Sequence, residues 1–230
     1  MKKSFTLLEL VFVIVVIGII SLATIRNIPS DNLERAAIQL ASHIRYTQHL
    51  ALTHDFFSAT DPHWFKRRWR ISFNRGEGTN SHWAYTVWAD TAGTASGSPD
   101  PQEIAINPLN NSKKLTGGFN GNLFIHTGDP EATEELNIGE YYGILDVRFS
   151  SACRTGTHSK SIGFDHVGRP LRGAIENYTS PYDSSVATNI LIVSQCQITL
   201  CTVTDCTLAN DEEKKVIAIE AETGYIHILK

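Results

Sequence analysis

The sequence lacks the short motifs that carry catalysis in many hydrolases and nucleotide-binding enzymes. It contains no Gly-x-Ser-x-Gly segment, which places a serine nucleophile on a sharp turn, and no glycine-rich phosphate-binding loop. Its nine histidines do not follow the spacing of a metal site. We therefore predict that the chain is not an enzyme and that it has no catalytic residues, no cofactor and no bound metal.

A strong excess of one charge and internal repeats are missing as well. The chain has 20 lysines and arginines against 24 acidic residues, a net charge of −4. A mildly acidic chain does not bind nucleic acid through bulk charge, although it can still carry a local basic patch. The sequence has no repeat of fixed period and no low-complexity segment. Its 230 residues are long enough for one domain with a substantial core.

Long hydrophobic runs are also scarce, and the chain holds one, at its N-terminus. Two lysines precede an almost wholly apolar stretch from Phe5 to Ile25, which contains a single carboxylate, Glu9. A helix over this stretch spans roughly 31 Å, close to the hydrocarbon thickness of a bilayer. We predict a membrane-spanning helix over residues 5–28 with the lysines on the cytoplasmic side. Glu9 is then either a functional intramembrane acid or an acid near enough to the interface to stay hydrated.

The N-terminal octapeptide KKSFTLLE, residues 2–9, followed by the apolar run, resembles the class III leader of type IV prepilins and pseudopilins. The resemblance implies that residues 1–4 are a leader, that a prepilin peptidase cuts between Ser4 and Phe5, and that the new amine of Phe5 is methylated. The family usually has Gly before the cut, where this chain has Ser4. Glu9 is implied to act in assembly by pairing with the N-terminal amine of a neighbouring subunit, because an unpaired buried charge is costly.

Beyond residue 28 the pattern changes from one long apolar run to a helix and many short strands. Pro29 interrupts the run, since proline cannot donate a helical hydrogen bond. Apolar residues at three- and four-residue steps predict an amphipathic helix over about residues 31–55. Alternating apolar and polar residues predict short strands in a β-domain over about residues 64–230. The order predicts an α+β fold, with a helix packed on an antiparallel sheet or small sandwich.

The body of the chain is similar to the GspH/FimT-type minor pseudopilins. The similarity lies in the element order and in segments such as IGFDHVGRP at residues 162–170 and the closing IEAETGYI at residues 219–226. It implies a type IV pilin-like fold, in which a long N-terminal helix with a membrane-spanning first half packs on the sheet. Residues 29–230 are then a periplasmic domain anchored in the bacterial inner membrane and later built into a pilus or pseudopilus.

The implied function is that of a minor pilin or pseudopilin. Such a protein is a structural subunit of a type II secretion pseudopilus or a type IV pilus, and takes part in filament assembly and protein secretion. The implied partners are the prepilin peptidase, other pilins or pseudopilins, the inner-membrane assembly platform and its ATPase. Two alternatives stay open: a DNA-binding minor pilin for DNA uptake, and a periplasmic binding module or enzyme on an ordinary signal anchor.

All four cysteines lie in the part of the chain that this topology exports. An even number in an oxidising compartment predicts disulfides. Four cysteines allow three pairings, and the sequence slightly favours Cys201–Cys206 across a short turn together with Cys153–Cys196. Free thiols remain an alternative, as does a metal site, for which the Cys-x4-Cys-x4-Cys spacing is loose.

One basic segment, residues 63–70, interleaves cations with aromatic residues. Lysine and arginine can hold phosphates and an exposed tryptophan can stack on a base, so this segment is a possible DNA contact. The cations concerned are Lys66, Arg67, Arg68 and Arg70. The favoured alternative is a strand with its tryptophan side in the core and its arginine side in water, because residues from Trp69 onward alternate.

Overall fold

The structure is a computed structural model that describes residues 10–16, 32–91, 96–120, 125–155, 160–182 and 190–229. The chain divides into two compact units, Met1–Asp31 and Asn32–Lys230. In the first unit, residues 10–16 are helical and their side chains are exposed. The expected cleavage site at Ser4 and Phe5, and the expected assembly residue Glu9, lie outside the described residues.

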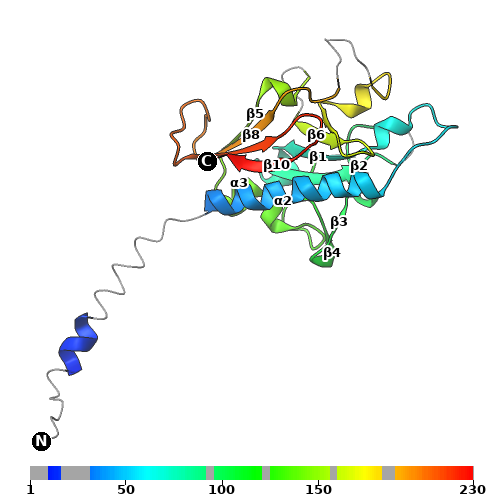
Figure 1. The fold of residues 1–230 in the computed structure, drawn as a ribbon. Helices are drawn as coiled ribbons and strands as arrows, with labels where there is room; N and C mark the ends of the chain where they lie inside the picture. The colour runs from blue at the N-terminus through cyan, green and yellow to red at the C-terminus, as the bar shows by residue number, and fades with distance from the viewer. Residues whose placement is uncertain are drawn as a thin grey trace, which may run out of the picture. The chain divides into compact units, whose positions relative to one another are not determined.

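The second unit contains two four-stranded antiparallel sheets (Figure 1). We call the sheet with the order β2-β1-β6-β7 the first sheet, and the sheet with the order β10-β9-β8-β5 the second sheet. The first sheet consists of β1 (Trp69–Asn74), β2 (Ala84–Ala89), β6 (Ser161–Phe164) and β7 (Pro170–Arg172). The second consists of β5 (Asp146–Phe149), β8 (Cys196–Cys201), β9 (Lys214–Ile219) and β10 (Ile226–Leu229). A small hairpin pairs β3 (Ile106–Asn107) with β4 (Asn110–Lys114).

A 22-residue helix, α2 (Asn32–Thr53), packs against strands of both sheets. Its buried residues recur at three- and four-residue steps and so form one stripe along the helix. They are Leu33, Ala36, Ala37, Leu40, Ala41, Ile44, Thr47, Leu50 and Ala51. The alanines lack bulk, which lets the helix backbone come close to the strands. A second helix, α3 (Ile138–Tyr142), is short and contacts α2.

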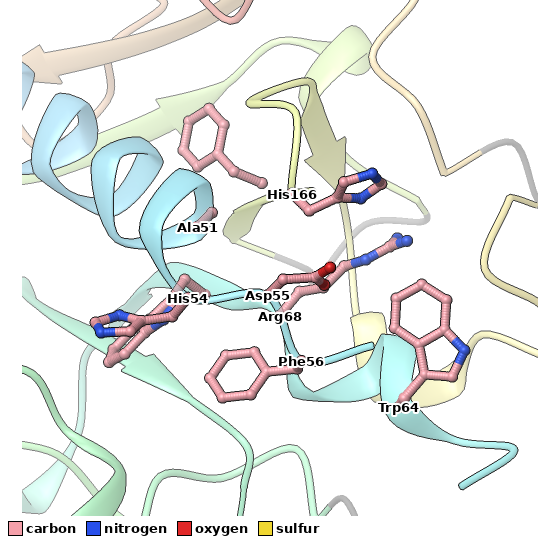
Figure 2. Close-up of a pocket in the computed structure, with 9 residues that line it drawn as sticks. Ala51, His54, Asp55, Phe56, Trp64, Arg68 and His166 are labelled. Atoms are coloured by element: carbon pink, nitrogen blue, oxygen red, sulfur yellow. The ribbon is translucent and has the colours of Figure 1, made fainter. Parts of the chain in front are cut away.

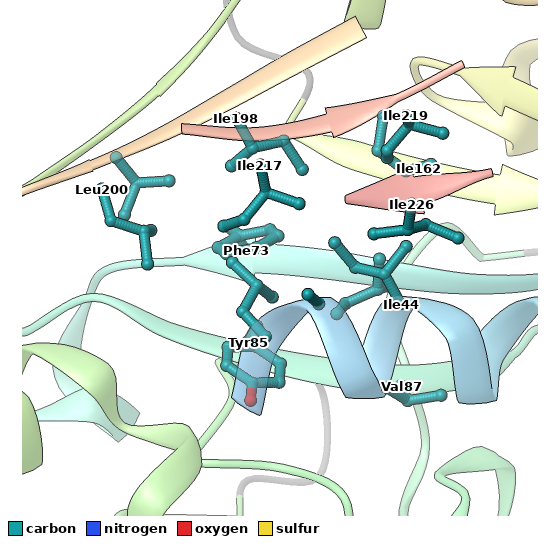
Figure 3. Packing of buried hydrophobic residues seen from close by; sticks show 14 of the residues in the cluster. Ile44, Phe73, Tyr85, Val87, Ile162, Ile198, Leu200, Ile217, Ile219 and Ile226 are labelled. Carbon is teal, nitrogen blue, oxygen red and sulfur yellow. The ribbon is translucent and has the colours of Figure 1, made fainter. Parts of the chain in front are cut away.

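The main core lies between α2 and the two sheets (Figure 3). Ile44 of α2, Phe73 of β1 and Ile217 of β9 are among its buried members. The ring of Phe73 lies 5.5 Å from that of Tyr85 in the same sheet and 5.3 Å from that of Phe149 in the second sheet. Since fully burying such a side chain contributes about 1.5–3 kcal/mol, this shared core joins helix and sheets into one unit.

The expected type IV pilin-like α+β fold, built on one long N-terminal helix, is wrong for the described part of the chain. That part is mostly β-sheet, with three helices: residues 10–16, α2 and α3. Among the described residues no helix is both long enough and apolar enough to cross a membrane. The first half of the expected long helix was to be residues 5–28. In the second unit, by contrast, the apolar residues lie mainly in two sheets of paired strands.

Candidate functional site

The four cysteines form two disulfides, Cys153–Cys196 and Cys201–Cys206. This confirms the prediction of disulfides and matches the favoured pairing, so neither free thiols nor a cysteine metal site describes this structure. Both bonds end on β8: one joins its first residue to the turn after β5, and the other joins its last residue to a loop five residues on. The second sheet is therefore braced covalently at both ends of its β8 strand.

The basic segment does not form one exposed patch. Lys66 and Arg67 belong to a 3₁₀ turn, η1 (Trp64–Arg67), and both are half-buried. Arg67 forms an ion pair with Asp61 at 2.8 Å. Arg68 and Arg70 are only 4% and 1% exposed. Two of the four cations suggested for a DNA contact are thus buried, and that contact stays a prediction. The favoured alternative placed the arginine side of the strand in water, which the burial of Arg68 and Arg70 contradicts.

The side chain of Arg70 lies on the outer side of the first sheet, which faces away from the main core. An ion pair and a contact with an aromatic ring hold it there. Its Nη1 atom lies 3.1 Å from a carboxylate oxygen of Glu176, and its guanidinium lies 4.5 Å from the ring centre of Trp88. It also donates hydrogen bonds to the backbone carbonyls of Lys66 and Arg68. Burial lowers the pKa of Arg70, and Glu176 opposes that shift. We interpret Arg70 as a structural residue, since its hydrogen bonds are all made within the fold.

Arg68 differs from Arg70 because its hydrogen bonding is incomplete. Its Nη1 atom donates to the carbonyl of Pro181 at 3.0 Å, and its guanidinium lies 5.4 Å from the ring of Trp64 and 4.8 Å from that of Tyr182. The Nε and Nη2 atoms are buried and have no hydrogen-bond partner among the described residues. Burial lowers the pKa of Arg68, while Tyr182 and Asp165 raise it. The side chain carries a charge that nothing in the described part of the chain pairs directly.

The buried carboxylate of Asp165, whose charge acts on Arg68, already has hydrogen-bond partners of its own. It accepts hydrogen bonds from the backbone amides of Val167 and Arg169 at 3.1 and 2.8 Å, and from Nε of Arg169 at 2.8 Å. The hydroxyl of Tyr182 donates to it at 3.3 Å. Asp165 therefore fixes the turn after β6, and it acts on Arg68 only through the longer-range field.

Arg68 lines a hollow that we call the Arg68 pocket (Figure 2). Its cavity volume is about 10 Å³, room for about one water molecule. Its walls come from the end of α2, η1, the start of β1 and the turn after β6. The lining residues are Ala51, His54, Asp55, Phe56, Trp64, Arg68, Trp69, Phe164 and His166. Figure 2 shows the guanidinium of Arg68 between the rings of Trp64 and His166. The pocket thus combines one cation with aromatic walls.

Sequence reasoning singled out Arg68 but missed the residues that make its surroundings. His166, Tyr182 and Pro181 are more than 90 residues away in the chain, and no spacing rule links them to Arg68. The one available signal was the segment IGFDHVGRP at residues 162–170, which supplies Phe164 and His166 to the pocket.

Comparison of the chain with protein family models, curated proteins and solved structures finds no match. The functional interpretation therefore depends on the N-terminal sequence and on the geometry described above.

Proposed function

We propose that the chain is a minor pilin or pseudopilin, a structural subunit of a type II secretion pseudopilus or a type IV pilus. The observation that carries this proposal is the N-terminal sequence: two lysines, Ser4, Phe5, and Glu9 inside an apolar run that continues to Ile25. On this proposal the protein starts as a bacterial inner-membrane precursor with its body in the periplasm. Its partners are the prepilin peptidase, other pilins or pseudopilins, and the assembly platform with its ATPase.

The position of Glu9 supports the proposal on physical grounds. A carboxylate inside an apolar segment is costly unless it meets a cation, and cleavage before Phe5 creates a charged amine at the start of that segment. When such segments pack side by side, the amine of one chain and the Glu9 carboxylate of the next can neutralise each other. The pair also favours the axial register in which the two groups meet.

The second unit is compatible with exposure outside the cytoplasm. Its four cysteines are oxidised to two disulfides, a state that persists in oxidising compartments. Its core is continuous from α2 to both sheets, so it can serve as the body of a subunit. DNA uptake is not proposed, because two of the four cations suggested for DNA contact are buried.

Mass spectrometry of the mature N-terminus tests the proposal. In a host with a prepilin peptidase, we expect a chain that begins at Phe5 and carries one added methyl group, and in a matched host without the enzyme an uncut chain. Ser4→Gly, which restores the usual family residue, should be cut at least as completely. An intact Met1 in both hosts, or a cut near residue 25, contradicts the proposal and favours a binding module or enzyme on an ordinary signal anchor.

Glu9→Ala tests the assembly role separately. We expect the variant to insert in the membrane and be cut normally, but to be missing from sheared filaments or strongly reduced in them. Thr6→Ala, a polar-to-apolar change in the same segment, is the matched control and should assemble normally. Normal incorporation of the Glu9 variant would remove the assembly role while leaving the cleavage result intact.

A further inference from the structure

We propose that Asn110 is a site of N-glycosylation, at which an oligosaccharide is joined to the side-chain nitrogen Nδ2. The site lies on the β3–β4 hairpin and shares no residue with the disulfides, the buried arginines or the N-terminal segment. Three observations carry the proposal: the tripeptide that begins at Asn110, its exposure at the end of the hairpin, and the hydrogen bonds of the Asn110 side chain.

The tripeptide Asn-x-Ser or Asn-x-Thr, with x other than proline, is the acceptor sequence of N-glycosylation. The chain contains two such tripeptides, Asn110-Asn111-Ser112 and Asn177-Tyr178-Thr179. A pattern this short also arises by chance, so the sequence alone does not separate a modified asparagine from an unmodified one. The surroundings of the two tripeptides in the fold do separate them.

Residues 108–112 form the exposed end of the β3–β4 hairpin, at the margin of the second unit (Figure 1). Leu109, which directly precedes the acceptor, is 92% exposed. The hairpin is anchored by the buried Asn107, whose Nδ2 donates to Thr133 Oγ1 at 3.1 Å and whose Oδ1 accepts from the amide of Leu109 at 2.9 Å. An enzyme can therefore reach Asn110 without opening the core, and a change at Asn110 leaves the anchor in place.

The side chain of Asn110 has its oxygen engaged and its nitrogen free. Oδ1 accepts hydrogen bonds from the backbone amide of Ser112 at 3.1 Å and from the Ser112 hydroxyl at 2.7 Å, which makes an Asx turn. Nδ2 has no hydrogen-bond partner in the described part of the chain. The turn thus leaves the nitrogen that must react open to solvent, and it holds the hydroxyl of the tripeptide against the same amide group.

The second tripeptide is built into the fold. Asn177 is exposed, but it ends the 3₁₀ turn η6 (Ile175–Asn177). Tyr178, the middle residue, is only 8% exposed and belongs to a small apolar cluster. An enzyme that must surround all three residues would first have to pull Tyr178 out of that cluster. We therefore expect the folded chain to be modified at Asn110 and not at Asn177.

The reaction needs a sugar donor, and the class we propose is an oligosaccharide attached to a membrane lipid through a diphosphate. Nδ2 of Asn110 forms a bond to the anomeric carbon of the first sugar. The bond from that carbon to the diphosphate oxygen breaks, the lipid diphosphate leaves with the electron pair, and Nδ2 gives up one proton. Modification in the cell rests on the export that the proposed function includes, because glycosylation of this tripeptide belongs to secreted proteins.

A reaction with purified components tests the acceptor without relying on export. The full chain in mild detergent, with its disulfides intact, is incubated with an N-oligosaccharyltransferase that requires only the tripeptide and with its lipid-linked donor. Mass spectrometry should find the oligosaccharide on Asn110 and not on Asn177. The same chain, reduced and alkylated so that it unfolds, should carry it on both. A folded chain without sugar on Asn110, or with equal modification of both asparagines, overturns the proposal.

Substitutions in the exposed loop locate the acceptor. Asn110→Gln removes the reacting amide and Ser112→Ala removes the hydroxyl, and each should abolish modification of the hairpin. Ser112→Thr keeps the tripeptide and should be modified. Asn111→Gln is the matched control, because it changes the neighbouring amide and leaves the tripeptide intact, and it should be modified as the unaltered chain is. Sugar that persists on the hairpin of Asn110→Gln, or full modification of Ser112→Ala, overturns the proposal.

A bacterial host that supplies the prepilin peptidase, the oligosaccharyltransferase and its donor separates this site from the filament proposal. Both ends of the question are measured on the same molecules, and we expect chains that begin at Phe5 to carry sugar on Asn110. A chain cut before Phe5 but bare at Asn110 overturns the site and leaves the filament proposal standing. Sugar on Asn110 of a chain cut near residue 25 supports the site and overturns the filament proposal. An intact Met1 with a bare Asn110 contradicts the filament proposal, and the reaction with purified components then decides the site.

Discussion

The two sheets of the second unit are buried in different ways. In the second sheet, β8 alternates buried and half-buried residues over most of its length, as expected when one face meets the core. In the first sheet, all six residues of β2 are buried, and β1 buries Arg70 as well as Ile71. The first sheet is therefore covered on both faces. Alternation along a strand shows which residues share a face, but not whether that face is open to water.

The cover on the outer side of the first sheet is made of two small apolar clusters and charged residues. Trp88 packs there with Ile104, Ile125 and Ala132. Phe65 packs with Leu171, Ile175, Tyr178 and Ile190. The guanidinium of Arg70 contacts the ring of Trp88 in the first cluster and pairs with Glu176, the residue after Ile175 of the second. The first sheet thus depends on paired buried charge, while the second sheet depends on disulfides and apolar burial.

The largest expected effect comes from removing the buried charge of the first sheet. Arg70→Ala should lower the free energy of unfolding by about 3–5 kcal/mol, because it leaves a cavity and removes the partner of Glu176. Urea denaturation of the full chain measures the loss. The double variant Arg70→Met with Glu176→Leu is the control and should lose much less, since apolar residues of similar volume can replace a buried pair. Equal losses would show that neither the cavity nor the unpaired Glu176 sets the cost, and that the hydrogen bonds of Arg70 to the carbonyls of Lys66 and Arg68 do.

The second prediction concerns the two disulfides that end on β8 of the second sheet. In the loop-entropy model, removing Cys153–Cys196 should cost about 4 kcal/mol and removing Cys201–Cys206 about 2 kcal/mol, because the first bond closes the longer loop. Paired cysteine-to-alanine variants, compared in the same denaturant series, measure both losses. A larger loss from the short loop would mean that native contacts near residues 201–206, and not loop entropy, dominate.

A third prediction concerns the contact between α2 and the first sheet. His43 Nδ1 lies 2.7 Å from the hydroxyl of the buried Tyr85, to which Gln39 Nε2 donates at 3.0 Å. Burial lowers the pKa of His43 to about 4, with Glu135 opposing the shift. The unfolded chain therefore binds the proton at higher pH than the folded chain does. Stability is full above about pH 6.5 and falls by about 3 kcal/mol as the pH drops to 4.

Stability measured between pH 7 and pH 4 checks this prediction. His43→Gln should flatten that part of the curve. Arg45 offers a matched control on the same helix, because its Nη2 atom donates to the Ile226 carbonyl of the second sheet at 2.9 Å. Arg45→Gln should lower stability at every pH and leave the slope unchanged. A slope that survives in His43→Gln would assign the pH dependence to another group.

Local features of the fold could be predicted from the sequence. The apolar stripe of α2 and the alternation in β1 depend on residues close in the chain. The pairing of four cysteines has only three possible combinations. β7 at Pro170–Arg172 and β4 at Asn110–Lys114 were missed because they are short and polar or begin with proline. Their pairing comes from neighbours, which a local pattern does not show.

The candidate site could be predicted only in part. Arg68 stood out because it lies among other cations, but its burial depends on Tyr182 and Pro181, which reach it across more than 110 residues. Because these distant residues cover it, Arg68 lines a pocket and does not lie on an exposed patch.

The smallest expected effect completes the comparison of the sheets. Arg148 on β5 stands between the buried Val147 and Phe149, just as Arg70 stands next to the buried Ile71. Its side chain is 54% exposed and lies 3.5 Å from Asp205, itself 52% exposed. An exposed pair contributes little, so Arg148→Ala should change the free energy of unfolding by less than about 0.5 kcal/mol, and added salt should change that result little. A loss near that of Arg70→Ala would contradict the comparison, because an arginine on an exposed face would then cost as much as a buried one.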